Sequence, residues 1–101
     1  MTANLARRPT KPKDLIHRKL GDEIMAVNLN NKFFYNLDSL GSFIWERCDG
    51  RHSVAQIAEA ITEEYEVEPE VAIQDCEQFI QELVQEGMLE WASSPEANAQ
   101  D

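Results

Sequence analysis

The strand-to-helix junction near the middle of this chain constrains its fold more than any other segment. An apolar run, Phe33–Leu37, leads directly into Asp38, a residue type that caps helices. A helix containing Trp45 is expected next, and Asp49-Gly50 is a typical helix end. In a small domain this order leaves one edge of a sheet open beside a helix, where an extended peptide can bind. The pattern favours a peptide-binding module over an enzyme.

Three short strands are predicted ahead of that helix. Residues 15–20 alternate weakly, residues 23–29 are almost continuously apolar as expected of a middle strand, and residues 32–37 alternate again. Gly21-Asp22 and Asn30-Asn31 separate these strands, because Gly and Asn tolerate the backbone conformations of tight turns. The sequence therefore predicts an antiparallel meander with strand 32–37 at its edge.

Three helices are predicted to follow the strands. The first begins at Asp38 or Ser39, the second begins with a capping box at 53–56, and the third lies between Pro69 and Gly87. Each carries an apolar stripe at helical spacing, which must be buried against the sheet or another helix. The predicted fold class is α+β: a winged-helix-like domain with a three-stranded antiparallel sheet followed by three α-helices.

The length of 101 residues indicates one domain. We expect a disordered basic arm at 1–13, a folded domain at 14–91 and a disordered polar tail at 92–101. Within the domain, residues 88–91 are expected to extend briefly and pack back on the core. No run approaches the ~18 apolar residues of a membrane span, and no signal peptide is evident. A cytoplasmic monomer is expected, with no membrane partner.

Charge is distributed unevenly along the chain. Residues 1–19 carry a net charge of +5, whereas residues 20–101 carry −15. Such an acidic body repels phosphate backbones and favours cationic or neutral partners, so no nucleic acid is expected to bind. A winged-helix DNA-binding regulator needs a basic recognition helix, and Val54–Tyr65 contains no Lys or Arg. The acids also have a simpler explanation, which stays open: they keep a small domain soluble.

No residue pattern in the chain indicates catalysis or metal binding. Cys48 and Cys76 occupy helix-like positions without metal-ligand spacing, and we expect two buried, reduced thiols rather than a disulfide. His17 and His52 are isolated and are expected at the surface. A Ser/His/Asp set and a phosphate-binding glycine loop are both missing from the pattern. The sequence therefore predicts no enzyme activity, no cofactor and no metal site.

One ordered series of residues extends over most of the predicted domain. Its members are Tyr35-Asn36-Leu37-Asp38, Gly41, Ile44-Trp45, Asp49-Gly50, Ile57, Tyr65, Val67, Asp75, Phe79, Leu83 and Gly87-Met88-Leu89. This series resembles the PqqD-like family, whose members are also called RiPP recognition elements, and the resemblance covers roughly residues 15–91. Asp38 stands where many members have Asn. Because both residue types cap helices, this difference leaves the expected fold unchanged.

The resemblance implies a function as well as a fold. Family members are not catalysts; they bind the leader segment of a ribosomally made precursor peptide and present it to a modifying enzyme, such as a radical SAM protein, a leader peptidase or a cyclase. The leader adds as a strand to the third strand, beside the third helix. This chain resembles the stand-alone members. Two alternatives stay open: a winged-helix DNA-binding regulator, and an acidic protein–protein adaptor that holds no peptide.

Transferred to this sequence, the resemblance places the peptide site on the third strand and the third helix. The residues expected to bind peptide are Lys32, Phe33, Phe34, Tyr35, Asn36, Asp75, Phe79, Glu82 and Leu83. Several of them have a second interpretation. Phe33, Tyr35, Phe79 and Leu83 also fit core positions. Phe34 is either a leader contact or an ordinary exposed aromatic. Asp75 either pairs with a basic leader residue or faces solvent.

Overall fold

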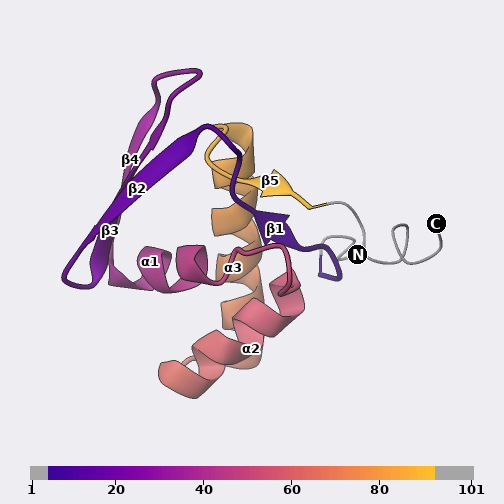
Figure 1. Cartoon of the computed structure of the whole chain (residues 1–101). Helices are drawn as coiled ribbons and strands as arrows, with labels where there is room; N and C mark the ends of the chain where they lie inside the picture. Colours follow the sequence, from indigo (N-terminus) through magenta and orange to yellow (C-terminus); the bar gives the residue numbers. More distant parts are fainter. Residues whose placement is uncertain (1–4, 93–101) are drawn as a thin grey trace.

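The structure, a computed structural model, describes residues 5–92 as a sheet and three helices with a small strand pair beside them (Figure 1). In chain order the elements are β1 (Pro9–Thr10), β2 (Leu15–Leu20), β3 (Glu23–Asn28), β4 (Phe34–Leu37), α1 (Ser39–Glu46), α2 (Val54–Glu64), α3 (Pro69–Gln85) and β5 (Glu90–Trp91). The predicted α+β fold is confirmed. None of the helices in the described part is long and apolar enough to cross a membrane.

Strands β2, β3 and β4 form an antiparallel meander in that order, so β4 is an edge strand as predicted. The strand begins at Phe34 rather than at Lys32. The reason is a turn closed by backbone bonds, in which Lys32 N donates to Asn28 O at 2.8 Å and Asn28 N donates to Phe33 O at 2.9 Å. Lys32 has a left-handed backbone with φ 62°, which no strand residue adopts.

Local chemistry sets the helix ends close to their predicted positions. Asp38 Oδ1 accepts a hydrogen bond from Gly41 N at 2.8 Å, and this bond caps α1 immediately after β4. Ser53 forms the predicted capping box of α2 with Gln56. Helix α3 has Pro69 in its first turn and is followed by Gly87 at φ 80°, a conformation that suits glycine. The first helix therefore starts directly beside the edge strand.

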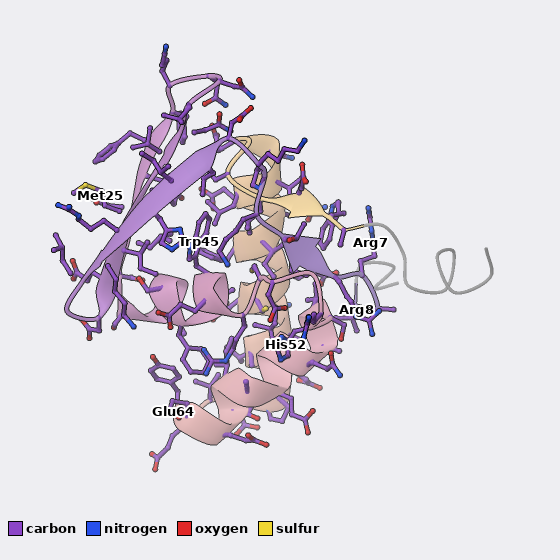
Figure 2. All side chains as sticks on the ribbon, viewed as in Figure 1. Arg7, Arg8, Met25, Trp45, His52 and Glu64 are labelled. Carbon is purple, nitrogen blue, oxygen red and sulfur yellow. The ribbon has the colours of Figure 1, made fainter. Side chains whose placement is uncertain are left out.

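The core lies between the sheet and the helices. Its largest fully buried side chains include Trp45, Ile57, Ile80 and Leu83. Figure 2 shows Trp45 inside the molecule, between the three-stranded sheet and α3. The ring of His17, on the helix-facing side of β2, meets the indole edge-on with centroids 6.0 Å apart. Trp45 is thus a central core residue.

Both cysteines are buried and free, as predicted. Burial raises the pKa of Cys48 and of Cys76 to about 12. Both thiols therefore stay protonated near neutral pH. A protonated, buried thiol is neither a nucleophile nor a metal ligand, so the cysteines act as small core residues.

The expectation of a disordered arm and tail is wrong for residues 5–13 and for Ala92. Strand β1 pairs antiparallel with β5, with Pro9 opposite Trp91, and Ala92 N donates to Arg8 O at 2.7 Å. The Arg7 guanidinium lies 4.4 Å from the centre of the Trp91 ring. The arm is ordered by partners from the far end of the chain, which local patterning does not show. The predictions for residues 1–4 and 93–101 lie outside the described residues.

Lys11 gives the N-terminal segment a structural role. Its ammonium donates to Trp45 O at 2.8 Å and to Cys48 O at 3.0 Å, two carbonyls at and just beyond the C-terminal end of α1. It also lies 5.2 Å from the centre of the Trp45 ring. Burial lowers the pKa of Lys11, and nearby groups including Asp49 partly offset that shift. A cation at this end of a helix satisfies the carbonyls and complements the helix dipole.

Replacing Lys11 with Met is expected to lower the free energy of unfolding by about 1–2 kcal/mol, because the methionine keeps the apolar stem and loses the charged hydrogen bonds. Urea titration followed by circular dichroism measures the change. Lys13→Met is the matched control, since Lys13 is exposed and its loss should change stability by less than about 0.5 kcal/mol. Equal effects of the two substitutions would contradict a capping role for Lys11.

Candidate functional site

The free edge of β4 is the first component of the candidate site. In the described part of the chain, β4 pairs only with β3. Because Phe33 O accepts a bond from Asn28 N, the antiparallel alternation directs the backbone groups of Phe34 and Asn36 away from β3. Both residues are exposed. Their N–H and C=O groups are therefore available to another strand.

A groove of about 400 Å³ lies alongside this edge, between β4, the start of α1 and the middle of α3. Its lining residues are Tyr35, Asn36, Leu37, Asp38, Leu40, Gly41, Ile44, Asp75, Gln78, Phe79 and Glu82. The apolar members are buried or half-buried, whereas Asp38, Asp75, Gln78 and Glu82 are exposed. The groove thus has an apolar floor and a polar, mainly acidic rim.

Gly41 sets the width of the groove floor. A Cβ atom at this position would lie 3.2 Å from Phe79 Cε1 and 3.2 Å from Asp38 Oδ1. Such contacts are tighter than most side chains allow, so the missing side chain lets the first turn of α1 approach the ring on α3. The close approach brings the strand edge, the helix cap and the aromatic ring into one continuous surface.

The electrostatics of the groove are negative. Asp38, Asp75 and Glu82 contribute carboxylates, and none of the lining residues is Lys or Arg. Partial burial raises the pKa of Tyr35, and the neighbouring Glu82 carboxylate raises it further. The phenol therefore stays protonated beside an acid. A ligand that brings a positive charge to this rim gains Coulomb attraction without a competing cation in the lining.

The structure brings together five of the nine residues expected to bind peptide: Tyr35, Asn36, Asp75, Phe79 and Glu82. The other four lie elsewhere. Lys32 is in the turn before β4. Phe33 is half-buried, with its ring centre 6.0 Å from that of Tyr35. Phe34 is 51% exposed on the opposite face of the sheet, and Leu83 is fully buried in the core.

Sequence reasoning missed the contribution of α1 to the groove. The groove residues outside the prediction are Leu37, Asp38, Leu40, Gly41, Ile44 and Gln78. A signal for most of them was present, because a helix capped at Asp38 immediately after a strand must place its first turn beside that strand. The spacing of Leu40 and Ile44 also puts both on one helix face.

Other kinds of site find little support in the part of the chain that the structure describes. No cluster of three or more His, Cys, Asp or Glu side chains in residues 5–92 has the arrangement of a metal site. The second helix carries Glu59, Glu63 and Glu64 and has no Lys or Arg. A surface of this sign repels duplex DNA, which argues against the winged-helix regulator.

Comparisons with known proteins agree with this geometry. The sequence profile described as "Coenzyme PQQ synthesis protein D (PqqD)" matches residues 23–89. The solved structure of TbiB1 in complex with the TbiA(beta) leader peptide is similar, with a TM-score of 0.76 and 25% identity over 80% of this chain and 94% of that chain. A lasso peptide synthetase B1 complexed with its leader peptide has the same fold, with a TM-score of 0.74 and 22% identity over 81% of this chain and 96% of that chain.

Comparison with curated proteins gave no match. The family profile nevertheless extends from β3 to the end of the core, across β4 and all three helices, and therefore includes the whole groove. This chain belongs to the PqqD family.

Proposed function

We propose that this protein binds the leader segment of a ribosomally made precursor peptide. The leader adds as a strand to the free edge of β4 and places alternate side chains in the groove against α3. The observation that carries the proposal is the position of an unpaired strand edge directly beside an apolar groove, in a chain of the PqqD family. The structural neighbour TbiB1 was solved in complex with a leader peptide, which supports this assignment.

The physics of strand addition suits this edge. The backbone groups of Phe34 and Asn36 offer sequence-independent hydrogen bonds, and the groove offers selection by side chain. Burying two or three leader side chains contributes about 1.5–3 kcal/mol each before the cost of ordering a flexible peptide. Micromolar to nanomolar dissociation constants follow from that balance.

In this proposal the protein presents the precursor rather than transforming it. The groove contains carboxylates and one phenol but no nucleophile paired with a base among its lining residues. The bound leader tethers the rest of the precursor, and a modifying enzyme then acts on the tethered segment. The protein works as a cytoplasmic monomer in this scheme.

Titration of isotope-labelled protein with a precursor leader tests the proposal. We expect amide shift changes concentrated in residues 34–41 and 75–82, because these segments form the edge and the groove. A scrambled leader of the same composition is the control and should leave the spectrum unchanged. Shifts confined to α2, or equal shifts with the scrambled peptide, would point instead to an adaptor that holds no peptide in this groove.

A further inference from the structure

The edge strand presents chemically different surfaces on its two faces, and an added strand must match both. Because side chains alternate along a strand, residues of the added peptide face the groove and the outer surface of the sheet in turn. On β4, the alternation directs the side chains of Tyr35 and Leu37 toward the groove and those of Phe34 and Asn36 toward the outer face, although Asn36 also borders the groove. The chemistry beside each of these four residues limits what a bound peptide can carry there.

The outer face next to the edge is apolar. The register aligns Ile16, Val27 and Phe34 in one row across the three strands. Ile16 is 58% exposed and Phe34 is 51% exposed, so the row is open to solvent. Figure 2 shows Met25, from the next row, on the side of the sheet away from the helices. A peptide residue paired with Phe34 would extend this row, and an apolar side chain there gains cross-strand packing.

The groove face beside Tyr35 is acidic. Glu82 lies close enough to Tyr35 to raise the pKa of the phenol, and Asp75 lines the same groove about two turns earlier on α3. No ion pair engages either acid among the described residues. The whole segment 54–90 contains eleven acids and no Lys or Arg. A cationic peptide side chain beside Tyr35 therefore meets uncompensated negative charge.

The groove face beside Leu37 is apolar. Leu37 and Ile44 are each 2% exposed, and the half-buried Leu40 and Phe79 complete the floor. A charged side chain placed there would lose hydration without gaining a partner, whereas an apolar side chain is stabilised by burial. The third position, beside Asn36 on the outer face, is exposed, so a polar side chain stays hydrated there.

We propose, on the basis of the proposed function, that this edge selects a peptide segment with a four-residue pattern: apolar, cationic, polar, apolar. The pattern is read along β4, from the residue beside Phe34 to the residue beside Leu37. It defines the ligand as a cationic leader with one apolar side chain on each face of the added strand. The selectivity combines a hydrophobic row outside, a carboxylate rim inside and an apolar floor.

A displayed library of short random peptides, selected on the immobilised full chain, tests this pattern. Enriched peptides are expected to contain Lys or Arg with one apolar residue directly beside it and a second apolar residue two positions away on its other side. In a synthetic copy of an enriched peptide, replacing the cationic residue by Glu should weaken binding about fivefold or more in fluorescence anisotropy. The difference should shrink at high salt, because salt screens exposed charge pairs.

Variants of the protein assign each position of the pattern. Glu82→Lys should reverse the preference so that the peptide with Glu binds better, whereas Glu70→Lys, the same charge change at the start of α3 and outside the groove, should keep the preference for Lys. Phe34→Ser should remove the preference for an apolar residue at the first position. Leu20→Ser is its control, because Leu20 is 60% exposed on the far strand β2.

The outcomes separate this inference from the proposed function. Enriched peptides that shift the amides of β4 but show no preference for a cation, or a Glu82→Lys protein that keeps its preference for Lys, overturn the pattern and leave leader binding intact. Enriched peptides that leave the amides of β4 unshifted overturn both. Enrichment of the ordered pattern, together with a reversed charge preference in Glu82→Lys, establishes the inference.

Discussion

Methylating one leader amide that points toward β4 is expected to weaken binding roughly a hundredfold. Two backbone positions, Phe34 and Asn36, offer their N–H and C=O groups at the free edge. An N-methyl group on the paired peptide residue removes a donor and fills the ~4.8 Å gap between strands, so both ladder bonds are lost. At about 1–1.5 kcal/mol for each bond, two lost bonds correspond to roughly a hundredfold.

The control for this experiment is the same leader methylated at the alternate amides. Those amides point away from β4. We therefore expect the dissociation constant of this methylated leader to stay within about threefold of that of the unmodified leader. Isothermal titration calorimetry measures both peptides without altering the protein. If the two methylated leaders bind equally well, the leader does not pair with this strand, and the groove alone holds it.

Replacing Trp45 with Ala is expected to lower the free energy of unfolding by about 3–5 kcal/mol. The indole is 1% exposed, meets His17 edge-on and lies under the Lys11 ammonium, so its removal leaves a large cavity at the centre of the core. A domain of this size has roughly 5–10 kcal/mol of stability in total. The variant should therefore retain a small fraction of that stability, as measured by urea titration with circular dichroism.

Two further substitutions serve as comparisons for Trp45→Ala. Trp45 Nε1 has no hydrogen-bond acceptor among the described residues. Trp45→Phe keeps most of the ring volume and removes an unpaired N–H group, so it should cost less than half as much as Trp45→Ala. Ile16→Ala, at a site 58% exposed, should change stability by under about 0.5 kcal/mol. A loss for Trp45→Ala as small as that of Ile16→Ala would contradict the central role of the indole.

Elements with local signals were predictable from the sequence. The caps at Asp38 and Ser53 and the stop at Gly87 each act through neighbours within a few residues, and the structure shows each in that role. The alternation predicted for residues 32–37 is seen in the structure from Phe34 onward, where Tyr35 and Leu37 are half-buried or buried and Phe34 is exposed. The start of β4 was less predictable, because Lys32 belongs to the preceding turn. The backbone hydrogen bonds that close this turn leave no signal in the alternation of apolar residues.

The ordered arm was beyond sequence reasoning for a different reason. Lys11 contacts carbonyls more than thirty residues away, at separations of 34 and 37 positions, and β1 pairs with a strand near the other end of the chain. A basic, proline-containing segment has the composition of a disordered tail. Its order comes from nonlocal bonds, and these do not appear in local composition.

The sequence by itself determined the order of strands and helices, the edge position of the third strand of the meander and the acidic character of the body, because these depend on periodicity, capping and charge. Only the tertiary structure decided which side chains form the groove. It buried Leu83 in the core and brought the first turn of α1 against Phe79 across Gly41. Those outcomes depend on how packed elements meet in space, and a one-dimensional pattern does not contain that information.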